Sequence, residues 1–226
     1  MLHERVFPNL SEFLRYLAAH PEAENSLPPL IELGRELSIG VAALREQLEV
    51  ARSLGLVEVK PRTGMRRKPY TFAPAVLKSL DYAIALNKDH FIAFADLRQH
   101  IETAYWHESV KLLTTQDHSA LQELVARAWK KLRGSPIEIP HPEHRELHLT
   151  IYSRLNNPFV TGLLQSYWDA YETVGLNFFT DYNYLTEVWN YHQQMVDSIC
   201  SNDVEAGFRA LSEHTDLIYQ LISSSQ

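Results

Sequence analysis

The sequence predicts a mainly α-helical protein with two parts, an N-terminal winged helix-turn-helix with a small β-hairpin and a C-terminal antiparallel bundle of six or seven helices. Three observations support this prediction. The chain begins with short segments whose apolar residues recur at helical spacing, followed by a strand–turn–strand pattern. A proline-containing stretch over 69–74 resembles a linker, and apolar residues recur at helical spacing through the rest of the chain. We therefore expect domains at residues 1–70 and 75–226.

The first two helices are expected over residues 10–18 and 30–37. Apolar side chains recur every three or four positions in both segments, and Asn9 or Ser11 is suited to cap the first helix. Two prolines precede the second segment, where their fixed backbone angle suits the start of a helix.

A third helix is expected over 41–54, because its apolar residues share one face and Gly55 is suited to end it. Residues 56–59 then alternate like a strand, 61–64 form a turn, and Met65 begins a second strand. The order helix, helix, turn, helix, hairpin is that of a winged helix-turn-helix.

The remainder of the chain is helical in pattern, with no stretch that alternates like a strand. Helices are expected over 75–87, 91–113, 119–133, 143–155, 159–174, 185–201 and 204–223. Such a series, joined by short polar or proline-rich breaks, predicts a helical bundle.

Composition excludes several classes of protein. With 45% hydrophobic and 22% charged residues, the chain is neither disordered nor collagen-like. A single cysteine, Cys200, excludes an intrachain disulfide and fits a reducing compartment. No secretory signal and no apolar run of about 18 residues is evident, so we expect a cytoplasmic protein with no membrane partner.

Charge is unevenly distributed along the chain. Residues 1–70 carry ten Lys and Arg against nine Asp and Glu, whereas residues 71–226 carry eleven against nineteen. Basic residues gather in the predicted hairpin, at Lys60, Arg62, Arg66, Arg67 and Lys68. Such a cluster is suited to contact phosphate even on an acidic protein. The alternative is a solvated loop.

Residues 5–68 resemble the DNA-binding domain of the GntR family of bacterial transcription factors. The resemblance rests on Leu27-Pro28, Glu32-Leu33, Leu37, Leu44-Arg45-Glu46, Leu48 and Gly55-Leu56-Val57, with Gly64 at the wing tip. It implies a homodimer that binds palindromic operator DNA, with the third helix in the major groove and the wing on the backbone or minor groove. The DNA-binding residues would be Arg45, Lys60, Arg62, Gly64, Arg66 and Arg67.

The sequence departs from this family where arginine is expected. Pro29, Leu30 and Ile31 replace a Ser-Glu-Arg run, and Gly40, Val41 and Ala42 replace the polar start of the recognition helix. Because arginine commonly reads guanine through two hydrogen bonds, we expect weaker or differently specified DNA binding that depends on the wing. The alternative is an interaction module that has lost DNA binding.

Four histidines of the C-terminal part are candidate metal ligands. His144 and His148 are four residues apart and share a helix face, and His192 and His214 lie among apolar residues at helical spacing. By itself this spacing is a weak signal, because histidines occur at it by chance.

Residues 75–222 resemble the all-helical effector-binding (FCD) domain of the FadR-type branch of the GntR family. The resemblance implies that His148, His192 and His214 bind a metal, and His144 stands where the family has an aspartate. His144 is either a fourth ligand or not a ligand. An imidazole-rich site favours zinc or nickel over magnesium or calcium.

Arg98 and Glu102 match an Arg-x-x-x-Glu of the same domain. Arg98 either forms a simple salt bridge one helical turn long or binds the carboxylate of a small organic-acid effector. The combined interpretation is a ligand-responsive transcription regulator, most simply a repressor. The alternative of a metal-dependent enzyme has only Glu143, Glu146 and Glu187 as conceivable general bases and leaves the winged helix without a role.

Overall fold

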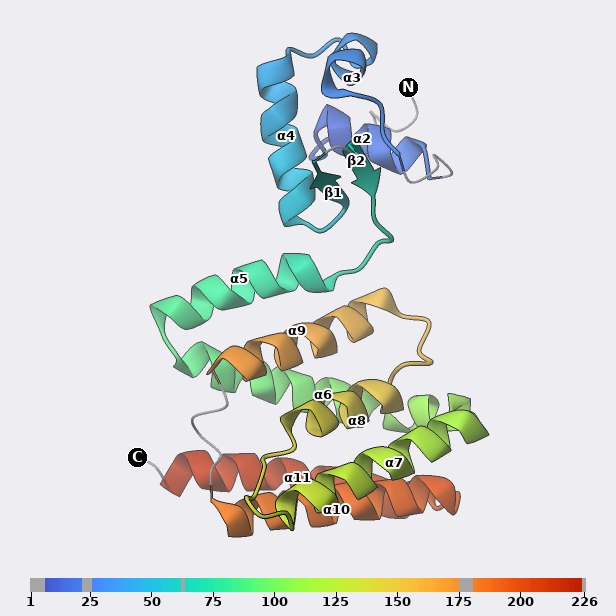
Figure 1. Ribbon diagram of the computed structural model, residues 1–226, viewed down its shortest axis with the longest axis vertical. Helices are drawn as coiled ribbons and strands as arrows, with labels where there is room; N and C mark the ends of the chain where they lie inside the picture. Colours follow the sequence, from blue (N-terminus) through green and yellow to red (C-terminus); the bar gives the residue numbers. More distant parts are fainter. Residues whose placement is uncertain (1–6, 22–25, 62–63, 175–180, 225–226) are drawn as a thin grey trace. The chain divides into compact units, whose positions relative to one another are not determined.

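The computed structural model describes residues 7–21, 26–61, 64–174 and 181–224 (Figure 1). It divides into two compact units, Met1–Lys78, called here the N-terminal unit, and Ser79–Gln226, called the helical unit. The protein is mainly helical with one small antiparallel sheet, which confirms the predicted fold class.

The N-terminal unit contains three helices and a hairpin, in the predicted order. These are α2 (Glu12–Ala19), α3 (Leu30–Glu36), α4 (Val41–Ser53), β1 (Val57–Lys60) and β2 (Gly64–Arg67). Ser11, rather than Asn9, caps α2, because its side chain accepts a hydrogen bond from the Leu14 amide. Helix α4 packs through Leu44 and Leu48, which are buried with Phe13 of α2.

A side-chain amide fixes α4 against the start of α2. The Gln47 carbonyl oxygen accepts a hydrogen bond from the Phe13 amide at 2.9 Å, and its NH₂ group donates to the Glu12 carboxylate at 2.8 Å. Gln47 therefore satisfies one of the amides that a helix start leaves unpaired. These contacts of Gln47, together with the buried Leu44 and Leu48, hold α4 in place.

The wing is a regular two-stranded ladder in which Val57 pairs with Arg67 and Lys60 with Gly64. Gly64 has φ +76°, a left-handed conformation that suits the predicted turn glycine. An isolated bridge from Leu27 to Met65 adds a short contact on the other edge of β2, which the sequence pattern did not predict.

Over the described residues seven helices follow, where six or seven were predicted. They are α5 (Ala73–Leu86), α6 (Asp89–Leu112), α7 (Thr115–Leu132), α8 (His141–Ile151), α9 (Pro158–Val174), α10 (Tyr182–Cys200) and α11 (Val204–Ser224). Helix α5 begins at Ala73, within the expected linker, and runs from the first unit into the second. Helix α8 ends at Ile151 rather than at residue 155.

Helix α7 starts earlier than its apolar pattern predicts because of a capping box. The Thr114 side chain accepts from the Asp117 amide, and the Asp117 carboxylate accepts from the Thr114 amide at 2.8 Å. Arg154 adds two further hydrogen bonds to the same carboxylate, at 3.0 and 2.9 Å. This network joins the start of α7 to the residues just after α8.

The core of the helical unit is built around large buried side chains, including Trp106 of α6 and Trp189 of α10. Helices α10 and α11, joined by a short turn, pack along each other, and α7 packs on both α8 and α10 (Figure 1). None of the described helices combines the length and apolar character needed to cross a bilayer.

Candidate metal centre

Three helices bring the four predicted histidines together. His144 and His148 lie one turn apart on α8, His192 comes from the middle of α10, and His214 comes from α11. One ring nitrogen from each residue lies within 4.8 Å of those of the other three. His148, His192 and His214 are at most 1% exposed, and the Nε2 atom of His144 is also buried.

Several of these buried nitrogens have no hydrogen-bond partner among the described residues. They are His144 Nε2, His192 Nδ1 and His214 Nδ1. His148 Nε2 faces His192 Nε2 at 3.0 Å. Leaving buried polar atoms unpaired is costly, and imidazole nitrogens are common ligands of zinc and related metals. The donor set and the unpaired nitrogens therefore fit a divalent metal.

Electrostatics keep these imidazoles neutral. Burial lowers the pKa of His144, His148, His192 and His214 well below the ordinary value, and Arg98 lowers it further in all four. Neighbouring imidazoles add to this lowering of the pKa at His144, His192 and His214. Neutral imidazole is the form that binds a metal, so the site is prepared for binding without first losing protons.

Arg98 and Glu102 of α6 form a buried ion pair beside the histidines. Arg98 Nη2 lies 2.8 Å from Glu102 Oε2, and the two side chains are 2% and 0% exposed. Burial opposes the charge of Arg98, and Glu102 outweighs it, so the pKa of Arg98 rises above its ordinary value. The guanidinium also lies over the rings of Tyr167 and Trp168, at 4.7 and 4.9 Å from their centres.

The same pair contacts His148 directly, which the sequence did not predict. Glu102 Oε1 lies 3.1 Å from His148 Nδ1, and Arg98 Nη2 lies 2.8 Å from that nitrogen. The spacing of Arg98 and Glu102 indicated a pair on one helix face, but only the packing of α6 near α8 shows that both reach the histidines.

Aromatic side chains enclose the centre. The His144 ring lies against Trp168, with ring centres 4.6 Å apart, and Tyr171 and Trp189 are within about 6 Å of it. A cavity of about 10 Å³, lined in part by His141, His144 and Tyr184, reaches the cluster at His144. That volume is near the space that one water requires.

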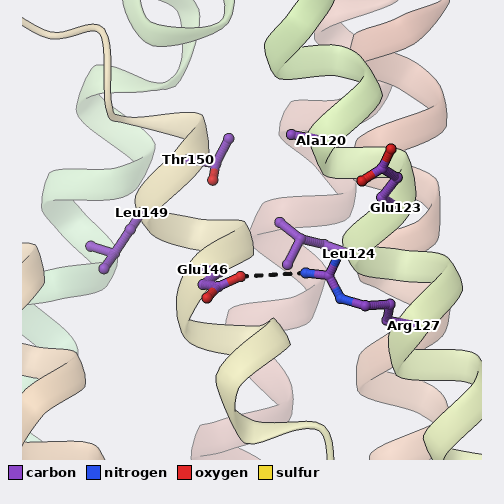
Figure 2. Close-up of a pocket in the computed structure, with 7 residues that line it drawn as sticks. All are labelled: Ala120, Glu123, Leu124, Arg127, Glu146, Leu149 and Thr150. Atoms are coloured by element: carbon purple, nitrogen blue, oxygen red, sulfur yellow. Dashed lines mark hydrogen bonds and ion pairs between the residues drawn. The ribbon is translucent and has the colours of Figure 1, made fainter.

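Ion pairs join α8 to α7. Glu143 is buried and lies 2.9 Å from Lys131 Nζ, and Glu146 pairs with Arg127 at 3.4 Å. Figure 2 shows the Arg127–Glu146 pair crossing a surface groove lined by Ala120, Glu123, Leu124, Arg127, Glu146, Leu149 and Thr150. Two of the three carboxylates named as conceivable general bases, Glu143 and Glu146, are therefore engaged by cations of α7.

The predicted DNA-binding residues of the N-terminal unit differ in their surroundings. Arg45 is exposed on α4, and Arg66 is exposed on β2. Lys60 is exposed and pairs with Glu58 at 3.1 Å, and Gly64 lies at the turn. Arg62 lies outside the described residues.

Arg67 is placed differently from Arg66. Its guanidinium donates a hydrogen bond to the main-chain oxygen of Leu17, and its Nε atom is buried. Alternation along β2 turns Arg67 inward while Arg66 stays exposed. Arg67 therefore connects the wing to α2 through this hydrogen bond.

Comparison with known proteins is consistent with these two units. The FCD domain model matches residues 93–217. The uncharacterized HTH-type transcriptional regulator YieP of Escherichia coli K12 is 25% identical over 209 residues, which cover 87% of this chain and 85% of that protein.

Solved structures show the same fold. Streptococcus agalactiae GntR has a TM-score of 0.65 at 15% identity and covers 96% of this chain and 99% of its own. E. coli McbR/YncC has a TM-score of 0.53 at 19% identity, with 100% and 99% covered. Of these three relatives, YieP is named as a transcriptional regulator. Because the FCD match spans more than half of its length, the chain belongs to the FCD-domain family, the FadR-type branch of the GntR transcription regulators.

Proposed function

We propose that the protein is a homodimeric repressor that binds palindromic operator DNA in the cytoplasm and releases it in response to a small carboxylate effector. In this proposal a divalent metal, zinc or nickel, is held by His144, His148, His192 and His214. The observation that carries it is the cluster of buried imidazole nitrogens without partners.

The ligand set supports zinc or nickel over harder ions. Four neutral imidazoles supply nitrogen donors and no charge, whereas magnesium and calcium prefer oxygen ligands. The bound metal would keep its full double charge and would attract an anion. Arg98 adds a second positive group beside the cluster, and its planar guanidinium is suited to a carboxylate.

Metal content tests the centre directly. Elemental analysis of protein purified without chelator should give about one equivalent of zinc or nickel per chain, and the His192→Ala variant should lose it. His100→Ala is the matched control, because His100 is 72% exposed on α6 and should keep the metal. Absence of metal from the wild-type protein, even after incubation with zinc or nickel, would contradict the proposal.

DNA binding is assigned to the exposed residues of α4 and the wing. Arg45, Lys60 and Arg66 are exposed, which suits contacts to base edges and phosphates. A dimer is expected because one small winged helix makes too few base contacts for useful specificity. Light scattering should give twice the mass of the chain.

Response to the effector requires that the carboxylate prefer one dimer geometry over another. Duplexes selected from a random library by the protein should show a two-fold symmetric motif. A panel of small carboxylates is then screened by thermal shift with the metal-loaded protein. Those that stabilise it should weaken binding to the selected duplex, and an Arg98→Lys variant should lose that response.

A further inference from the structure

We propose that Glu102 is a positioning residue of the metal centre, whose carboxylate holds His148 with Nδ1 protonated and Nε2 free to bind the metal. This inference rests on the proposed metal site. Nothing in the sequence pattern assigns Glu102 such a role, and it follows from the contacts of three buried side chains.

The two nitrogens of His148 share one neighbour, Arg98 Nη2, which lies 2.8 Å from Nδ1 and 3.2 Å from Nε2, and they differ in their other neighbours. Nε2 lies on the side of the histidine cluster, 3.0 Å from His192 Nε2. Nδ1 lies on the side of α6, 3.1 Å from Glu102 Oε1. A metal held by the cluster therefore needs the lone pair of Nε2, which leaves the proton on Nδ1.

Glu102 and Arg98 favour opposite tautomers of His148. An ionised carboxylate only accepts hydrogen bonds, so Glu102 stabilises a proton on Nδ1. A guanidinium only donates, so Arg98, whose Nη2 lies 2.8 Å from the same Nδ1 and 3.2 Å from Nε2, would by its shorter contact stabilise a lone pair on Nδ1 and favour the proton on Nε2. The second tautomer cannot bind a metal through Nε2.

The geometry lets Glu102 decide this competition. Its Oε2 atom lies 2.8 Å from Arg98 Nη2 while Oε1 lies 3.1 Å from His148 Nδ1, so each oxygen is next to a different neighbour. A carboxylate that receives the second nitrogen of a metal-bound histidine fixes the ring and makes it a better ligand. All three side chains are buried, so water does not replace the carboxylate.

The Glu102→Gln variant tests this inference at constant shape. A glutamine has one oxygen, which Arg98 would take, and its NH₂ group would then face His148 as a donor. Zinc affinity, measured by competition with a chromophoric chelator, should fall by about 10–100-fold. The control is Tyr152→Phe, which removes a hydroxyl that donates to the main-chain oxygen of Glu102 and leaves the carboxylate in place. It should bind zinc like the wild type.

A double variant separates positioning from charge. Arg98→Met with Glu102→Met removes one positive and one negative group, so net charge near the metal is unchanged, and buried ion pairs often tolerate apolar replacement. Positioning predicts that zinc affinity stays at least about tenfold below wild type, because His148 still lacks its acceptor. Recovery of wild-type affinity would overturn the proposal, as would wild-type affinity in Glu102→Gln.

A spectroscopic measurement separates this proposal from that of the metal site. Nitrogen chemical shifts of His148 in metal-free protein should show the proton on Nδ1 in the wild type and a shift toward Nε2 in Glu102→Gln. If the wild type binds no zinc, the metal proposal fails while the tautomer is still tested. If zinc binds but His148 carries its proton on Nε2 in the wild type, the role of Glu102 is refuted.

Discussion

The two units of this chain place their candidate functional charges in opposite surroundings. In the N-terminal unit, Arg45 and Arg66 are exposed and lie outside the core that forms the fold. In the helical unit, Arg98, Glu102 and the histidines are buried within the bundle. Exposed residues can be substituted with little cost to folding, which fits the departure from the family pattern at Gly40, Val41 and Ala42. Buried residues contribute to the stability of the fold as well as to any binding.

The largest expected effect breaks the buried ion pair. Glu102→Ala should destabilise the helical unit by about 3–5 kcal/mol, because it leaves the Arg98 guanidinium buried without its carboxylate. Urea unfolding followed by tryptophan fluorescence measures this change, since all four tryptophans lie beyond residue 100. Arg45→Ala should change the stability of the protein by less than about 0.5 kcal/mol. Equal effects of the two substitutions would remove the contrast.

Acid should also act on the helical unit. Because folding lowers the pKa of four histidines, the metal-free folded protein binds fewer protons than the unfolded chain at pH values below the ordinary histidine pKa of 6.5. Stability should therefore fall as the pH drops below about 6.5, by up to about 1.4 kcal/mol per pH unit for each histidine. Urea titrations at pH 7.5 and 5.5, again followed by tryptophan fluorescence, measure the loss. Stability that is constant or higher at pH 5.5 would contradict burial of neutral imidazoles.

Arg45 should matter for DNA and not for folding. If it reads a base, Arg45→Ala should weaken binding to the selected duplex by about 1–3 kcal/mol and relax specificity at one position. Fluorescence anisotropy with single-base variants of that duplex gives both quantities. Unchanged affinity would favour an interaction module over a DNA-binding domain.

Helix caps allow a comparison between the units. Asp117→Ala should cost about 1–2 kcal/mol in the helical unit, because it removes the capping box of α7 and the hydrogen bonds from Arg154. Ser11→Ala, which removes the cap of α2, should cost about 0.5–1 kcal/mol in the N-terminal unit. Thermal unfolding by circular dichroism detects both, and the larger shift should come from Asp117.

Two neighbouring arginines of β2 should separate DNA binding from folding stability. Arg66→Ala should weaken DNA binding similarly for all sequences and reduce the slope of affinity against salt by about one. Arg67→Ala should instead lower the melting temperature, because it removes the contact with Leu17. Anisotropy at several salt concentrations, paired with thermal unfolding, distinguishes them. Identical behaviour of the two variants would refute the different roles.

The order of elements could be predicted from the sequence because apolar spacing, prolines and glycines act locally. Helix boundaries were less predictable, since the start of α7 depends on the side chains of Thr114 and Asp117 rather than on apolar pattern. The proximity of the four histidines was expected only from the family resemblance, and the structure places them together.

Two roles could not be predicted because each depends on contacts distant in sequence. Glu102 meets His148 only through the arrangement of α6 and α8, and Arg67 finds a main-chain oxygen of α2 that no side-chain pattern reveals. Charge patterns identify basic residues, but they do not show which of these residues make contacts within the fold.

The chain of contacts from Arg98 through Glu102 to His148 has a thermodynamic consequence. In the proposed arrangement, a carboxylate that takes Arg98 from Glu102 would alter the contact between Glu102 and His148 and, with it, the affinity for the metal. Linkage requires reciprocity, so the metal must change the affinity for that carboxylate by the same factor. The supply of metal in the cell would then set the effector concentration at which the operator is released.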